Sequence, residues 1–552
     1  MTQKRLISIK PVETRLPEDI YNNFETIIRE QVNKLPEPDM VMKPYKFPLE
    51  NIQKIAESDN NEYKESIRNM ADDLWAHNDW TDTLIVYYIL MHITNYTPVD
   101  FYKLGYTLGK LNKVDMAEEL INIYQSISVN KKVTYHALAN FYYCAVDIPE
   151  KAVKYFEKYI EFDNTNAAAY SSLGHLYPRI DKENGQEKQF AAFKKAYELK
   201  PDSPNIIKNM VNFYEKTHND EKIREFYPKL LKAAPSPRHS LDWGIYLVSR
   251  GEIKKGCSYM IERYDLDKYP IGYPKEILSN YPKWNYRDDI SDKTLLIHYE
   301  EGFGDSIMFG RFLPLLKQYA AKTILVIQPP LEGLFRYSKD LTDGVEIFSD
   351  IKDAITKYDK FVHMPLMDMP YPLGIDSDFI PYAQAYITAP APVFYDKSKI
   401  NIGIAYNGDV SANYNGRDIE LKEFYNIASL NGVQMYSLQA GDAAKQLDET
   451  PRNISIIDLG RKFKDFTDTA NAIQGLDLVI SSDNVILNLA GALGKKTYGI
   501  FNKYPNYRWF DLSEENVVWY ESVKPFICEK ENDWAQALKT AEEYLKKEFL
   551  NG

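Results

Sequence analysis

The sequence predicts an α + α/β protein in which an N-terminal solenoid of helical hairpins precedes two doubly wound α/β lobes. Three observations carry this prediction. Small residues recur at intervals of 33 to 37 residues in the first half of the chain. Apolar runs alternate with helical stretches from about residue 293 onward, and polar glycine turns follow several of these runs. The length of 552 residues suits three or four domains.

The repeat pattern is defined by one small or apolar position and a second one about twelve residues later. The first set is Ala71, Gly105, Ala139, Gly174, Val211 and Gly244, and the second is Ala117, Ala152, Ile223 and Gly256. Small residues let two helices approach closely, while larger ones fill the gap to the next repeat. The pattern resembles tetratricopeptide repeats over residues 62–265, most closely in YSSLGHLY. Residues 1–61 are predicted to be irregular and partly helical.

Residues 266–292 read as a proline-bearing connector, after which continuous apolar runs predict buried parallel strands. The first lobe, 293–390, contains TLLIHY (294–299), TILVIQ (323–328), GVEIF (344–348) and KFVHMPL (360–366). The second lobe, 391–552, contains INIGIAYNG (400–408), VQMYSLQ (433–439), ISIIDL (454–459), LDLVISS (476–482) and KTYGIF (496–501). Two such lobes facing one cleft favour the GT-B architecture. The amphipathic final helix is expected to pack across the lobes.

The turn after the first strand, EEGFGD, lies where open α/β sheets bind ligands. Gly302 and Gly304 would allow close backbone approach, and the following helix would present free N–H groups. The alternative for Asp305 is a simple helix N-cap. His298 could line the cleft or be a satisfied core histidine.

The second lobe offers two further polar clusters and one polar residue at a strand end. Asp483 and Asn484 open a helix after a buried strand, where backbone N–H groups and the helix dipole suit a diphosphate; an N-cap role for Asp483 is the alternative. Asn407 and Gly408 begin a Gly/Asn loop. It ends near Arg417, a plausible phosphate partner. Gln439, at the end of the next strand, is expected to point into the same region.

Composition excludes several classes of function. The net charge of −12 disfavours wrapping of duplex nucleic acid, which needs a basic face. No apolar run approaches the ~20 residues needed to cross a bilayer, and the N-terminus lacks the pattern of a signal peptide. The three cysteines, Cys144, Cys257 and Cys528, show no paired spacing, so neither a disulfide framework nor a zinc site is expected. These features predict a cytoplasmic protein.

From about Asp242 to the C-terminus the chain resembles tetratricopeptide-repeat glycosyltransferases related to the lipopolysaccharide heptosyltransferases. The stretches that carry the resemblance are collinear: WGIYLVSRGEIKKG, ERY, PKWNYRDDISDKTLLIHYEEGFGDSIMFGRFLPLL, GIAYNG, Arg417, SLQAG, DFTDTANAIQGLDLVISSDNVILNLAGALGKKTYGIF, NYRWF and NDW. The resemblance implies a GT-B fold and an inverting, metal-independent transfer from a nucleotide-sugar donor, without a cofactor. It implies Asp305 as general base, with Arg417 and the backbone at 483–485 stabilising the departing diphosphate.

The chain departs from the pattern of these relatives at four positions. Asn484 stands where Thr is usual and Asn488 where His is usual; Glu301 replaces a common Gln, and Asp418 a common Ser. Asn488 can still donate to a phosphate or a sugar, but it supplies no positive charge.

Two functions from different classes therefore stand side by side. The first is an active transferase that moves a sugar to a protein or glycan hydroxyl, with the repeat array binding the acceptor. The second is a catalytically inactive repeat scaffold that retains a sugar-nucleotide-binding module. Helical arrays bind peptides, brace other domains or dimerise, so the array alone leaves peptide binding and homo-oligomerisation open.

Overall fold

The computed structural model describes residues 61–93, 97–266, 275–408, 416–510, 512 and 517–550. The predicted N-terminal segment 1–61 lies outside these ranges except for its last residue, as does much of the loop between Gly408 and Arg417. The chain forms two compact units, residues 1–233 and 234–552.

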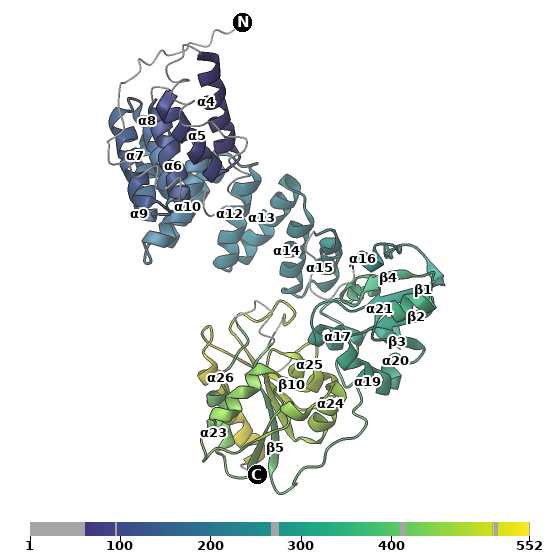
Figure 1. Ribbon diagram of the computed structural model, residues 1–552. Helices are drawn as coiled ribbons and strands as arrows, with labels where there is room; N and C mark the ends of the chain where they lie inside the picture. Colours follow the sequence, from purple (N-terminus) through teal and green to yellow (C-terminus); the bar gives the residue numbers. More distant parts are fainter. Residues whose placement is uncertain are drawn as a thin grey trace. The chain divides into compact units, whose positions relative to one another are not determined.

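The first unit is an array of antiparallel helix pairs, labelled in Figure 1. Consecutive helices pack on each other, and the helices from α4 to α11 share one apolar core. The helices are α4 (Asn61–Ala76), α5 (Trp80–Ile93), α6 (Pro98–Lys110), α7 (Val114–Ile127), α8 (Lys131–Asn140) with its π-helical extension η1 (Phe141–Ala145), α9 (Pro149–Phe162), α10 (Ala167–Ile180), α11 (Gly185–Leu199), α12 (Pro204–Lys216) and α13 (Asp220–Ala233). The predicted helical hairpins are therefore present.

The recurring small residues lie where the two helices of a hairpin meet. A Cβ added at Gly105 would lie 3.0 Å from the Ile121 side chain, and one at Gly174 would lie 2.3 Å from the Phe193 ring. Any larger residue at these positions would force the helices apart, which explains the period of the sequence pattern.

The last helix pair of the repeat pattern belongs to the second unit. α14 (Pro237–Val248) and α15 (Ile253–Met260), followed by the 3-10 turn η2 (Ile261–Asp265), share an apolar core with the α/β part of the chain. The backbone N–H of Ile253 also donates to Asp376 Oδ1 at 2.9 Å. This hairpin is thus built into the α/β unit, whereas the sequence predicted one repeat domain ending at 265.

The first lobe is a four-stranded parallel sheet of order β3-β2-β1-β4. Leu296 in the central strand pairs with Ile324 on one side and His363 on the other. Its elements are α16 (Lys275–Leu278), β1 (Ile290–His298), α17 (Phe303–Gly310), α18 (Leu313–Leu316), β2 (Ala320–Val326), α19 (Pro329–Tyr337), α20 (Lys339–Thr342), β3 (Val345–Phe348), α21 (Ile351–Lys357), β4 (Val362–Pro365), η3 (Leu366–Asp368) and α22 (Pro370–Leu373).

The second lobe is a six-stranded parallel sheet of order β10-β9-β8-β5-β6-β7. This is the doubly wound order 3-2-1-4-5-6 read from the other edge. Its elements are β5 (Ile400–Ala405), η4 (Leu421–Phe424), α23 (Tyr425–Ala428), β6 (Val433–Ser437), η5 (Asp442–Glu449), β7 (Ile456–Asp458), η6 (Gly460–Lys462), α24 (Phe466–Gly475), β8 (Leu478–Ser482), α25 (Val485–Ala492), β9 (Thr497–Phe501), β10 (Val523–Ile527), α26 (Trp534–Leu545) and η7 (Lys546–Leu550).

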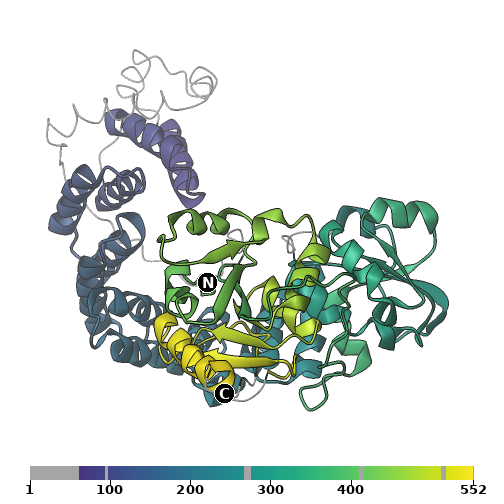
Figure 2. The same cartoon turned by 90° about the horizontal axis from the view of Figure 1, so that it is seen from below.

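Helices cover both faces of this second sheet (Figure 2). α24 and α25 pack on one face, and that core continues into the first lobe through the contact of α25 with α17. α26 packs on the other face with β9, β10 and η4. The expectation that the final helix packs across the lobes is therefore wrong, because its apolar face is used within the second lobe's own core.

Candidate functional site

The predicted polar clusters of the second lobe flank the point where its strand order reverses. That point lies between β5 and β8, and open α/β sheets bind ligands outside the carboxyl ends of the strands there. Asn407 and Gly408 follow β5, and Asp483 and Asn484 follow β8. Topology therefore places both clusters at the edge of the sheet where a ligand crevice is expected.

Asn484, not Asp483, is the N-cap of α25. Its Oδ1 accepts from the backbone N–H of Ile486 at 2.8 Å and Leu487 at 3.4 Å, and its Nδ2 donates to Ser482 Oγ. The N-cap alternative for Asp483 is thus wrong, because the helix begins one residue later than that alternative requires. Capping uses the side chain of Asn484, so any role of this residue toward a ligand falls to its backbone.

Asn488 is buried, and both the nitrogen and the oxygen of its side-chain amide are hydrogen-bonded. Its Nδ2 donates to the Asn484 carbonyl at 3.1 Å, and its Oδ1 accepts from the Tyr520 hydroxyl at 2.9 Å. A Cβ built at Gly304 would lie 3.0 Å from Asn488 Nδ2. Gly304 therefore allows the turn of the first lobe to approach α25 of the second lobe. The predicted close approach of this glycine to a ligand stays a prediction.

Gln439 braces the loop after β5. Its Oε1 accepts from the backbone N–H of both Tyr406 and Asn407, at 3.1 and 3.0 Å. Gly408 N donates to Asp418 Oδ1 at 3.1 Å, and with its amide oriented to suit its neighbours Asn407 donates to the Ile419 carbonyl. Gln439 does point into the predicted region, but its contacts there are with the backbone.

Arg417 and Asp483 line one small cavity between the two clusters, together with Gly416, Asn502, Asn506 and Trp534. Burial raises the pKa of Asp483, and the nearby Arg417 charge opposes this effect. Among the described residues, Asp483 Oδ2 is buried without a hydrogen-bond partner. The cavity measures about 10 Å³, room for roughly one water molecule.

The glycine turn of the first lobe holds Asp305 in the first turn of α17. Gly302 is the N-cap of this helix, and Asp305 Oδ2 accepts from the Gly302 backbone N–H at 3.3 Å. The N-cap alternative for Asp305 is therefore wrong, since the residue lies at the third helical position. The strained backbone belongs to Glu301, whose φ is 62°, and not to either glycine.

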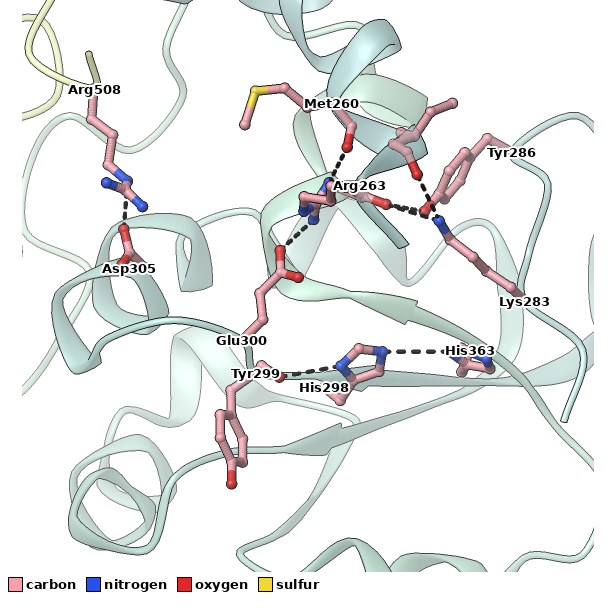
Figure 3. A network of polar contacts seen from close by, with 12 residues as sticks. Met260, Arg263, Lys283, Tyr286, His298, Tyr299, Glu300, Asp305, His363 and Arg508 are labelled. Atoms are coloured by element: carbon pink, nitrogen blue, oxygen red, sulfur yellow. Dashed lines mark hydrogen bonds and ion pairs between the residues drawn. The ribbon is translucent and has the colours of Figure 1, made fainter. Parts of the chain in front are cut away.

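The other oxygen of Asp305 contacts the second lobe. Asp305 Oδ1 lies 2.6 Å from Arg508 Nε, in the loop after β9, and this ion pair is drawn in Figure 3. The side chains of Asp305 and Arg508 are 15% and 16% exposed. Burial acts to lower the pKa of Arg508, but Asp305, Tyr507, Glu301 and Asp483 together outweigh it, so the pKa lies above its usual value. Asp305 thus contacts the second lobe through a partner that the sequence did not suggest.

The loop that carries Arg508 is fixed within the second lobe. Arg508 NH1 donates to Asn506 Oδ1 at 3.1 Å, and its guanidinium lies 4.6 Å from the centre of the Tyr507 ring. Trp509 is buried against Phe501, at 5.1 Å between ring centroids. The aromatic residues of this loop therefore pack and position Arg508.

A second charged network fills the reversal point of the first lobe, between β1 and β4. Arg263, at the end of the last repeat, pairs with both Glu300 and Asp368 (Figure 3). The hydroxyl of Tyr286 also donates to Asp368, and Lys283 Nζ lies 3.6 Å from the same carboxylate. Glu300 and Asp368 are 0% and 2% exposed. The carboxyl ends of these strands are thus occupied by side chains of this chain.

His298 is a buried histidine beside this network. Its ring lies 5.5 Å from that of His363, and His363 Nδ1 is 3.4 Å from His298 Nε2. Burial holds the pKa of His298 well below its usual value, as does the neighbouring His363. His298 also borders a cavity of about 390 Å³ with Tyr299, Val326, Pro329, Ser349, Asp350 and Ile351. First-lobe residues alone line this cavity, so a place for His298 in the cleft between the lobes stays a prediction.

Two arginines at these sites were not singled out from the sequence. Arg508 lies in NYRWF and Arg263 in ERY, both among the stretches that carry the family resemblance. An arginine held among aromatic or apolar residues, where charge is costly, was the available signal.

Within the described ranges, no cluster of three or more His, Cys, Asp or Glu side chains could hold a metal ion. Among the described helices, none combines the length and apolarity that a membrane span requires.

Fold and site together define a protein with helical repeats and two α/β lobes, each built on a parallel sheet. The chain matches no protein family model. It is 24% identical over 283 residues to protein FlbA of Caulobacter vibrioides; the match covers 46% of each protein, so the chain spans about half of this relative's length.

Solved structures similar to this chain include PilF of Pseudomonas aeruginosa, at 13% identity and a TM-score of 0.32, covering 40% of this chain and 98% of PilF. YrrB, described as a tetratricopeptide-repeat protein with an unusual peptide-binding site, matches at 17% identity and a TM-score of 0.27, covering 35% and 96%. MamA from Desulfovibrio magneticus RS-1 matches at 16% and 0.27, covering 31% and 94%.

Proposed function

We propose that this protein is an inverting, metal-independent glycosyltransferase of the GT-B type that takes its sugar from a nucleotide-sugar donor. The observation that carries the proposal is the meeting of two loops across the lobes. Asp305, after the first strand of one lobe, lies against the loop and helix tip that follow β9 and β8 of the other. A base on one lobe and a phosphate cradle on the other is the arrangement that such a transfer needs.

In the proposed reaction, the Asp305 carboxylate takes the proton of an acceptor hydroxyl. The acceptor oxygen forms a bond to the anomeric carbon as the bond from that carbon to the donor's phosphate oxygen breaks, and the electron pair leaves with the nucleoside diphosphate. Arg417 and the free backbone N–H groups at 483–485 would stabilise the departing negative charge. The hydrogen bond from Gly302 N to Oδ2 would keep the Asp305 carboxylate oriented.

The acceptor of the proposed reaction is a protein or glycan hydroxyl, with the helical array as its binding surface. The array supports this part of the proposal because concave helical solenoids offer extended surfaces to peptides. A homo-oligomer formed through the array is the other use of such a surface.

The experiment that tests the proposal uses the full chain and a panel of uridine, guanosine, cytidine and adenosine diphosphate sugars. Release of nucleoside diphosphate is measured with and without peptide and glycan acceptors, and products are identified by mass spectrometry. Transfer that requires one donor and one acceptor class supports the proposal. Absence of both hydrolysis and transfer across the panel contradicts it.

A non-catalytic scaffold that only binds a sugar nucleotide is the second candidate. One observation favours it: the candidate base Asp305 is paired with Arg508. This candidate predicts that nucleoside diphosphates raise the thermal midpoint while no donor is turned over.

A further inference from the structure

We propose that Arg508 binds the donor's diphosphate, and that Asp305 competes with that diphosphate for the guanidinium. Donor binding would then release the base in the same step that fills the cradle. This inference rests on the proposed function, since it takes a nucleoside diphosphate as the ligand.

The geometry of the ion pair would let Asp305 leave Arg508 without losing its orientation. The two oxygens of Asp305 have separate partners, because Oδ2 accepts from Gly302 N within its own helix turn and Oδ1 contacts Arg508 of the other lobe. Loss of the Arg508 contact would free Oδ1 alone. The carboxylate would stay oriented by Gly302, which is the state in which one oxygen can accept a proton from an acceptor hydroxyl.

Arg508 is held in place by neighbouring residues of its own loop. Asn506 and Tyr507 hold the guanidinium from within the loop after β9, at 3.1 Å and 4.6 Å. The positive charge therefore remains in the second lobe when Asp305 moves away. A planar guanidinium with several N–H donors is also suited to bind phosphate oxygens.

The charges around Arg508 set Asp305 and a diphosphate in competition for the guanidinium. Arg508 interacts electrostatically with Asp305, Glu301 and Asp483, and Asp483 interacts with Arg417. Three carboxyl groups thus face two arginines before any donor binds. A diphosphate adds further negative charge to this region, so it competes with Asp305 for the guanidinium.

The test measures the affinity of the full chain for uridine, guanosine, cytidine and adenosine diphosphates by calorimetry. If the bridge is formed about nine-tenths of the time, it lowers the apparent affinity about tenfold. Asp305→Asn should therefore bind the preferred nucleoside diphosphate about tenfold more tightly than the wild type. Arg508→Gln should bind it more weakly by on the order of 30-fold, and the double variant should resemble Arg508→Gln.

Asp448→Asn and Arg461→Gln are matched controls, because this Arg–Asp pair of the same lobe is 2.8 Å apart and much more exposed. Both should bind as the wild type does. Thermal midpoints identify a variant that fails to fold, and Asp305→Asn, which keeps the shape of the side chain, still decides the matter if Arg508→Gln does fail.

Equal or weaker binding by Asp305→Asn overturns the inference, and so does the lack of any diphosphate binding. The inference and the proposed function fail separately. Tighter binding by Asp305→Asn without sugar transfer by the wild type would sustain the Arg508 assignment and remove the transferase. Transfer by the wild type with no gain of affinity in Asp305→Asn would do the reverse.

Discussion

Replacing Arg263 should destabilise the second unit more than any loss of a surface ion pair. Arg263 neutralises Glu300 and Asp368, which are 0% and 2% exposed, so Arg263→Met removes the cation that pairs with both buried carboxylates, while Lys283 stays 3.6 Å from Asp368. Breaking a buried pair by removing one partner costs about 3–5 kcal/mol. We expect a loss in this range for the free energy of unfolding of the α/β unit.

The assay is hydrogen–deuterium exchange read by mass spectrometry in peptides that cover β1 and β4, combined with urea unfolding. A local readout is needed because a chain with two compact units has no single unfolding transition. Arg263→Met/Glu300→Gln/Asp368→Asn should recover most of the loss, since it removes the uncompensated charges along with the arginine.

Arg461→Met is the control for this prediction. Its partner Asp448 is 63% exposed, and such pairs contribute about 0–1 kcal/mol. The reasoning is refuted if Arg263→Met exchanges and unfolds like Arg461→Met, or if the triple variant is no more stable than the single one.

Two further predictions concern the interior of the second unit. Burial first, and then the Lys283 charge, lower the pKa of His363 to about 4. Because this histidine is neutral in the folded protein, the free energy of unfolding falls by about 3 kcal/mol as the pH drops from the unfolded pKa of about 6.5 toward 4. His363→Gln should therefore reduce the pH dependence of the free energy of unfolding in that window. An unchanged pH dependence would contradict this. Tyr520→Phe removes the hydroxyl that donates to buried Asn488 and should lower the free energy of unfolding by about 1–2 kcal/mol, whereas Tyr337→Phe, at a ring that is 56% exposed, should cost nothing measurable. Equal thermal midpoints for the two variants would show that this hydrogen bond does not stabilise the lobe.

Periodicity was sufficient to predict the alternation of elements, because it depends on which faces are buried. The strand β10 was missed, since VKPFI is short and carries Pro525 in its interior. Proline is tolerated there because β10 lies at the edge of the sheet. A property of sheet order, which the linear pattern does not contain, therefore decided this element.

The candidate site was predictable only as far as one loop at a time. The glycine turn and the tip of α25 were recognisable from strand–turn–helix patterns, and they do meet at Gly304 and Asn488. The partner of Asp305 was not predictable, because Arg508 lies 203 residues further along the chain (508 − 305) and reaches it only through the packing of two lobes. Capping by Asn484 depended in the same way on where the helix begins.

The central claim is that Asp305 is the base of a sugar transfer, and the most direct measurement is the kcat of nucleoside diphosphate release with saturating donor and acceptor. The account predicts that Asp305→Asn lowers kcat by about 100-fold or more while nucleoside diphosphate binding is retained. A kcat in Asp305→Asn equal to that of the wild type would contradict it.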